Sequence, residues 1–106
     1  MGYRSDVYAK IKLDHLFELK EALKQADLTD YAKTAVDDNF IYVQINDVKW
    51  YESYDDVRIF NNFIDSLDED AGMIAIGEDG VTTEYGYPYD LDLWTETRIG
   101  GFIHAN

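Results

Sequence analysis

Residues 3–26 read YRSDVYAKIKLDHLFELKEALKQA, and the hydrophobic period changes partway along this segment. Over residues 3–13 apolar and polar side chains alternate, which is typical of a half-buried β-strand. The apolar face of this predicted strand carries Val7, Ala9, Ile11 and Leu13. Over residues 16–26 apolar side chains recur at a helical spacing, which predicts an amphipathic helix ending near Asp27. The chain therefore opens with a strand followed by a helix.

The rest of the chain continues with short elements and short connections. We expect a helical turn over 29–35 and a loop over 36–39. Strands over 40–45 and 48–52 follow, joined by a tight turn at Asn46-Asp47. Next come a helix with the apolar stripe Val57, Phe60, Ile64 and Leu67, and strands over 72–77 and 81–85 joined by a turn at 78–80. Ser53 and Asp56 have the spacing of a capping box at the start of the second helix. Alternation resumes over 90–99, which is compatible with a sixth strand at a sheet edge.

This order of elements predicts one α+β domain spanning residues 1–106, a common size for a single domain. The order βαββαβ is that of a split βαβ, ferredoxin-like antiparallel sheet with two helices on one face, here followed by a C-terminal hairpin or extra strand. The other sheet face would carry Tyr8, Lys10, Tyr42 and either Trp50 or Tyr51. We expect either the C-terminal segment or a partner to cover that face.

The charge of the chain is strongly acidic and unevenly distributed. The formal net charge is -13, yet residues 1–35 hold six basic and six acidic side chains. Residues 36–106 hold three basic and sixteen acidic side chains, and residues 59–97 contain no Lys or Arg. Such a field repels nucleic acid and anionic membranes and attracts a cationic partner. A purely solubilising role of the charge remains an alternative.

The sequence carries no specific catalytic or metal-binding signal. It contains no cysteine, which excludes a disulfide scaffold and a thiolate metal site. Its two histidines, His15 and His104, lie far apart. We therefore assign no catalytic residues, no metal site and no cofactor. No segment has the length of a membrane span or the pattern of a targeting signal.

Three segments resemble a group of small uncharacterised proteins of tailed bacteriophages and prophages. They are MGYRSDV at residues 1–7, KWYESYDDV at 49–57, and IGED at 76–79 with Glu84 following. The resemblance implies a phage gene product made in the cytoplasm of a bacterial host. Small phage proteins of this size are often inhibitors of host machinery or host defence. The resemblance transfers no catalytic residue, and the segment after Tyr85 has no counterpart in that group.

Charge and resemblance together predict a non-enzymatic phage accessory protein that binds and inhibits a host protein with a basic surface. The inhibition would be of the anti-CRISPR or anti-restriction kind, with carboxylates that mimic nucleic-acid phosphates. One alternative is a small-ligand-binding or catalytic domain that uses the aromatic open face of the sheet. A second alternative is a structural phage component that acts as an oligomer. The oligomeric state stays open.

We predict a partner-binding site around the last hairpin and the segment that follows it. Loops on a rigid sheet often carry recognition residues, and Tyr offers a large rigid contact surface with a polar tip. The predicted charged contacts are Glu78, Asp79, Glu84, Asp90 and Asp92, and the predicted aromatic anchors are Tyr85, Tyr87 and Tyr89. The alternative is that Tyr85 and Tyr89 pack down on the sheet.

Overall fold

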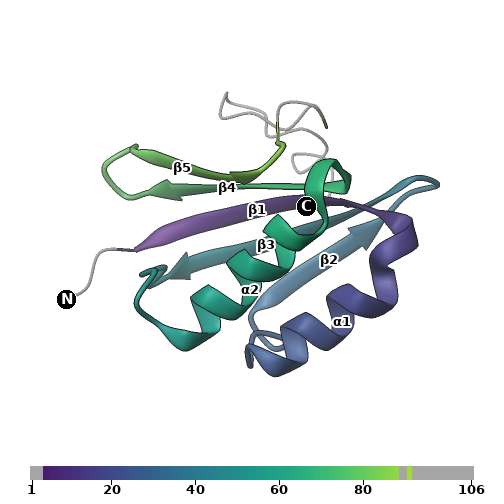
Figure 1. Ribbon diagram of the computed structural model, residues 1–106. Coiled ribbons are helices and arrows are strands. Elements are labelled where there is room, and N and C mark those ends of the chain that lie inside the picture. The colour runs from purple at the N-terminus through teal and green to yellow at the C-terminus, as the bar shows by residue number, and fades with distance from the viewer. Residues whose placement is uncertain (1–3, 89–90, 92–106) are drawn as a thin grey trace.

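A computed structural model describes residues 4–88 and Leu91, which form an antiparallel sheet with two α-helices on one face (Figure 1). The elements are β1 (Ser5–Lys12), a 3-10 turn η1 (Leu13–His15), α1 (Leu16–Gln25), β2 (Ala32–Val36), β3 (Phe40–Val48), α2 (Asp55–Ser66), a 3-10 turn η2 (Asp68–Asp70), β4 (Ala71–Gly77) and β5 (Thr82–Gly86). The strands are ordered β2-β3-β1-β4-β5, and each neighbouring pair is antiparallel. The expected α+β, split βαβ architecture with an added strand is confirmed.

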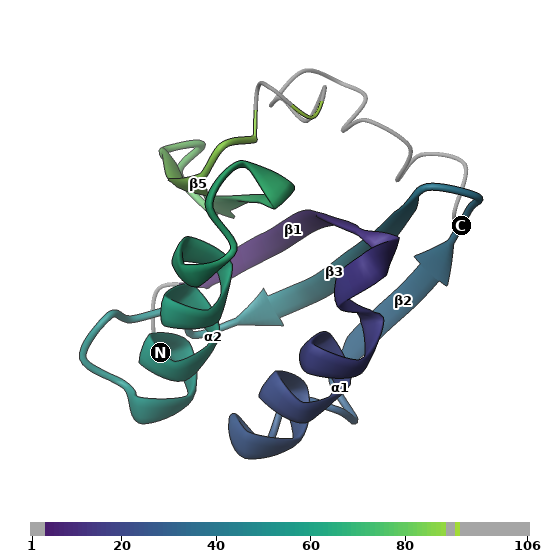
Figure 2. The ribbon, with the colours of Figure 1, turned by 45° about the vertical axis from the view of Figure 1, so that its right-hand side comes forward.

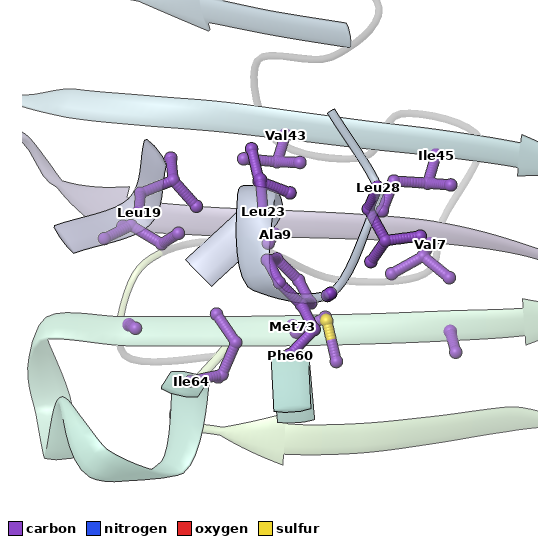
Figure 3. Packing of buried hydrophobic residues seen from close by; sticks show 14 of the residues in the cluster. Val7, Ala9, Leu19, Leu23, Leu28, Val43, Ile45, Phe60, Ile64 and Met73 are labelled. Carbon is purple, nitrogen blue, oxygen red and sulfur yellow. The ribbon is translucent and has the colours of Figure 1, made fainter. Parts of the chain in front are cut away.

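The hydrophobic core lies between the sheet and the two helices. The predicted alternation is confirmed, because Val7, Ala9 and Ile11 of β1 are fully buried, as are the facing residues of β3. Both helices direct apolar side chains toward the sheet, where Leu19 of α1 and Phe60 of α2 meet it (Figure 3). Burial of such side chains contributes about 1.5–3 kcal/mol each to stability. This packing fixes the position of both helices on the sheet.

The first hairpin lies one element earlier than the sequence predicts. Residues 32–36 form β2 instead of the expected helical turn, and they pair with β3 through a turn at Asp37. Oδ1 of Asp37 accepts hydrogen bonds from the backbone N–H groups of Asn39 (2.8 Å) and Phe40 (2.7 Å). An aspartate that binds the backbone two and three residues on in this way stabilises a tight turn. The expected loop at 36–39 is therefore the true hairpin turn.

Consequently, the expected turn at Asn46-Asp47 and the expected strand over 48–52 are wrong. β3 runs on to Val48, and Asn46 and Asp47 form an irregularity opposite Asp6 of β1. Asp47 has a φ of 56°, a left-handed conformation that Asp tolerates better than most residues. Its backbone N–H donates to the Asp6 carboxylate at 2.9 Å. The turn-like composition therefore marks a β-bulge.

The second helix begins without the expected capping box. Its N-cap residue is Tyr54, and among the described residues no side chain caps the helix. The Asp56 carboxylate instead accepts a 2.8 Å hydrogen bond from the backbone N–H of Val57. Ser53 lies one residue before the cap position, so its hydroxyl is out of register with the box. The predicted apolar stripe is confirmed, since Val57, Phe60 and Ile64 are fully buried and Leu67 packs against the core.

The last hairpin is confirmed, with β4 and β5 joined through residues 78–81. The chain then crosses back over β4 at a pair of glycines. Gly86 has a φ of 68°, and a Cβ added to it would lie 2.5 Å from the carbonyl oxygen of Ala71. A Cβ on Gly72 would lie 2.4 Å from the Cα of Pro88. Of the predicted strand over 90–99, only Leu91 is among the described residues.

In the part of the chain described here, no helix is long and apolar enough to cross a membrane.

Candidate protein-binding surface

The predicted hairpin residues do not form one cluster. Glu78 and Asp79 lie in the β4–β5 turn, where Glu78 accepts a 2.9 Å hydrogen bond from the backbone of Arg4. Asp79 accepts a 3.0 Å bond from the backbone of Val81. Glu84 pairs in register with Ile74, and Tyr85 with Met73, so neighbouring side chains of β5 point to opposite faces of the sheet. Tyr89, Asp90 and Asp92 lie outside the described residues.

Two of the predicted aromatic anchors can be placed. Tyr85 faces the helices and packs against the core, and its hydroxyl donates to Oε2 of Glu52 at 3.1 Å. Burial, followed by this hydrogen bond, raises the pKa of Tyr85 to about 12. Tyr87 is 49% exposed, so about half of its surface is open to solvent. Of the predicted tyrosines in the described residues, Tyr87 is therefore the more accessible one.

Of the aromatic residues expected on the outer sheet face, Tyr8 and Tyr42 lie there, while Trp50 and Tyr51 do not. Tyr8 and Tyr42 lie on this face and flank Ile74, which is fully buried. The ammonium group of Lys10 lies 4.5 Å from the ring centroid of Phe40 and 5.5 Å from that of Tyr42, both cation–π geometries. Tyr51 lies in the loop before α2, and Trp50 is buried in the core between sheet and helices. The outer face therefore combines two tyrosines and a phenylalanine with a lysine.

A larger acidic surface lies at one end of the sheet, where β3 and β4 end, α1 ends and α2 begins (left-hand end in Figure 1). Three adjoining hollows mark it, because neighbouring hollows share lining residues. We call it the end surface. Its charged residues are the carboxylates Asp6, Asp27, Asp47, Asp55, Asp56 and Glu78 and the basic side chains Arg4 and Lys49. Six carboxylates against two cations make it strongly acidic.

Two exposed tyrosines lie within this acidic surface. Tyr31 is 64% exposed and Tyr54 is 42% exposed, and both line a hollow of about 680 Å³ together with Asp27 and Asp56. Tyr54 also packs edge-to-face on Tyr51, with ring centroids 5.1 Å apart, which restrains its ring. An accessible, restrained ring beside carboxylates can contact the stem and the head of a Lys or Arg side chain.

The end of α1 places Asp27 and Tyr31 on this surface. The N–H of Leu28 bonds to the carbonyl of Leu23 at 2.8 Å, and the N–H of Asp27 bonds to the carbonyl of Lys24 at 3.1 Å. These two bonds form a Schellman motif, in which the left-handed position is held by Asp27, with a φ of 59°. The motif ends the helix and turns the chain outward into the segment that carries Tyr31.

Arg4 occupies the middle of the end surface and is largely engaged with Asp47. Its Nη1 donates to the carbonyl oxygen of Asp47 at 2.9 Å, and its Nε lies 3.8 Å from the carboxylate of the same residue. The Asp55 carboxylate pairs with Arg58. The nearby Trp50 Nε1 is buried without a hydrogen-bond partner among the described residues. The outward charge of this region is therefore dominated by carboxylates.

The sequence prediction found Glu78 but missed the rest of the end surface. The signal was present in two segments that mix tyrosine with acids, DLTDY at residues 27–31 and YESYDD at residues 51–56. Asp55 and Asp56 suit a helix N-terminus, so their composition has a local structural explanation. Only the topology brings the two segments side by side, since residues of both line one hollow.

A second cluster of titratable groups joins the start of α1 to the end of α2. His15 Nε2 lies 2.9 Å from Oδ2 of Asp70, and His15 Nδ1 lies 2.9 Å from Oε1 of Glu18. Lys12 Nζ lies 3.3 Å from the other carboxylate oxygen of Asp70. The hydrogen bond to Asp70, and then that to Glu18, raises the pKa of His15. This cluster ties two chain segments together, and neither His15 nor Asp70 lines the hollows of the end surface.

Comparisons of the chain with protein-family models, with curated proteins and with solved structures gave no match.

Proposed function

We propose that this protein is a non-enzymatic binding protein that docks its end surface onto a Lys/Arg-rich surface of a partner protein. The observation that carries the proposal is the position of Tyr31 and Tyr54, both exposed, inside a surface with six carboxylates. A cationic partner would use both the tyrosine rings and the carboxylates.

The two kinds of side chain have different tasks in such a complex. The carboxylates would attract a basic partner over several ångströms and raise the association rate constant, an effect that salt screens. The tyrosines would hold the complex through buried ring area and cation–π contacts, which mainly slow dissociation. Tyr and Arg are both enriched among residues that dominate binding energy.

We further propose that the partner is a bacterial host protein whose basic groove binds nucleic acid. The resemblance of residues 1–7, 49–57 and 76–79 to small phage proteins supports this extension. Carboxylates on the end surface would occupy positions that phosphates take in the groove, and the occupied groove would lose its nucleic-acid ligand. On this proposal the protein inhibits a host defence or processing system.

The experiment is affinity capture from bacterial lysate followed by kinetics with the purified partner. We expect a basic partner whose association rate constant falls by about tenfold or more between 50 and 300 mM NaCl. The double variant Tyr31→Ala/Tyr54→Ala should weaken binding by about tenfold or more, and Tyr87→Ala serves as the matched control on the hairpin side.

The same experiment separates the end surface from the predicted hairpin site. The charge-reversing pair Asp27→Lys/Asp56→Lys tests the first, and Asp79→Lys/Glu84→Lys tests the second. If only Tyr87→Ala and the hairpin pair weaken binding, the end surface is the wrong surface. A partner without a basic surface, or binding indifferent to salt, would overturn the whole proposal.

A further inference from the structure

The inner face of β2 is left partly uncovered by α1. Residues 32, 34 and 36 of β2 pair in register with Ile45, Val43 and Ile41, which are all buried on the helix side of the sheet. Thr34 and Val36 share that face but are exposed, and Val36 is 58% exposed. Figure 2 shows α1 lying alongside β2, at the edge of the sheet away from β5. The sheet therefore offers an apolar strip that the helix does not cover.

This strip and the flank of α1 enclose a groove of about 550 Å³. Leu16, Leu19 and Leu23 of α1 form one wall, Thr34 and Val36 of β2 form the other, and Ile41 lies at the floor. Leu19, Leu23 and Ile41 belong to the buried core, so the α1 wall and the floor are built from packed core side chains. Pockets of this volume and apolar character are typical of small-molecule sites. Protein interfaces need about 800 Å² from each partner, more than one short groove presents.

Two lysines stand at the rim of the groove. Lys20 and Lys24 are exposed, lie one helical turn apart, and line the groove together with Glu21. Neither lysine forms an ion pair with a carboxylate of the described residues. In a chain with 22 acidic and nine basic residues, two unpaired lysines beside an apolar groove form a local cationic site. Their charge is opposite to that of the end surface.

We propose that this groove binds a small amphiphilic anion, a molecule with an apolar body and a carboxylate or similar head group. The apolar body lies between α1 and β2 over Ile41, and the head group lies at the ammonium groups of Lys20 and Lys24. One carboxylate, Glu21, stands against two ammonium groups, so the site favours anions over cations. The end surface and this groove share no lining residue, so the two proposals stand independently.

The test uses decanoate and decyltrimethylammonium, both below their micelle concentrations, added to the isotope-labelled full chain. We expect decanoate to shift the methyl NMR signals of Leu19, Leu23, Val36 and Ile41, with half-saturation below about 1 mM. The cationic probe should bind at least about fivefold more weakly, since each exposed charge pair contributes up to about 1 kcal/mol. Equal affinity for both probes, or shifts that map elsewhere, would overturn the proposal.

Three variants make the test specific. Lys20→Gln/Lys24→Gln should weaken decanoate binding about fivefold. Lys33→Gln, on the outer face of β2, should leave it unchanged. Val36→Trp places a large ring in the groove at an exposed strand position and should abolish decanoate shifts while the fold is retained. Unchanged binding in both the lysine pair and Val36→Trp would show that the groove is not the site.

Discussion

Both ring nitrogens of His15 lie at hydrogen-bond distance from carboxylates, Asp70 on one side and Glu18 on the other. Only the protonated imidazolium can donate to both at once. The pKa of His15 is therefore raised above its ordinary value of 6.5, and the pKa of Asp70 is lowered from 3.8 by the same contact and by Lys12. The cluster links the β1–α1 junction to the α2–β4 junction, so its protonation state affects tertiary stability.

We predict that His15 stabilises the fold at mildly acidic pH and not at alkaline pH. A raised folded-state pKa gives stability that is fully present below pH 6.5 and is lost as pH rises through the folded-state pKa. Urea unfolding should show a difference between wild type and His15→Gln that is larger near about pH 5.5 than near about pH 9. An NMR titration of the His15 ring supplies the pKa directly. A difference of equal size at both pH values would assign His15 a packing role only.

Asp27 combines a strained backbone with a place on the end surface. A left-handed conformation costs a non-glycine residue about 1–2 kcal/mol, and replacing the residue by glycine removes this cost. Part of the stability gained is lost again, because glycine has greater conformational freedom in the unfolded chain. We predict that Asp27→Gly raises the free energy of unfolding by about 0.5–1 kcal/mol in urea titrations. The same variant should slow association with the basic partner, because it removes a carboxylate.

Asp27→Asn separates these two effects. Asparagine tolerates the left-handed conformation about as well as aspartate but carries no charge. It should leave the free energy of unfolding close to that of wild type and slow association as much as Asp27→Gly does. Loss of stability in Asp27→Gly would contradict the strain argument.

At the scale of elements, the sequence predicts those whose side chains alternate between core and solvent. β1, β3 and the apolar stripe of α2 follow hydrophobic periods that the structure confirms. β2 was missed because its residues, AKTAV, are mostly exposed and carry no clear period. Its strand conformation comes from pairing with β3 and from the turn at Asp37, both of which are tertiary or side-chain effects. Local propensity could not supply either.

The end surface illustrates the same limit for function. Charge counting pointed to a cationic partner, and turn composition pointed to Glu78. The proximity of Tyr31 to Tyr54 depends on where α1 stops and where α2 starts, which the Schellman motif and the β3–α2 loop determine. Residues 23 apart in sequence can be joined into one surface only after the topology is known.

Two glycines flank the path of β5, Gly80 in the turn before the strand and Gly86 at its last residue, and their different surroundings make a matched prediction possible. Gly80 and Gly86 both have positive φ. A Cβ on Gly80 would meet no atom of the described residues within 4 Å, while one on Gly86 would lie 2.5 Å from the Ala71 carbonyl oxygen. Gly80→Ala should cost about 1 kcal/mol and Gly86→Ala about 3 kcal/mol or more in chemical denaturation. Similar costs for the two variants would mean that the crossing over β4 relaxes easily.

At the scale of the whole molecule, the basic side chains are concentrated in the first elements of the chain. The first 35 residues, which supply β1, α1 and most of β2, hold six of the nine basic side chains. The groove with Lys20 and Lys24 lies between α1 and β2, at the β2 edge, while the end surface gathers six carboxylates. On these two proposals, an acidic docking surface and a cationic groove in different places would let two ligands of opposite charge bind at once.

The net charge of -13 leads to a final prediction about salt and stability. The ion pairs among the described residues, such as Arg4–Asp47 and Lys12–Asp70, involve exposed side chains and contribute at most about 1 kcal/mol each. Repulsion among unpaired carboxylates acts over the whole surface and destabilises the compact state. Raising NaCl from 20 to 300 mM should therefore raise the free energy of unfolding by about 1 kcal/mol, or the melting temperature by roughly 5 °C.

Sodium sulfate at equal ionic strength serves as the control for ion-specific effects. A fall in stability with NaCl would mean that attractive pairs outweigh repulsion. The same salt should weaken binding to a basic partner, so stability and affinity should move in opposite directions across one titration, which no loss of folding could imitate.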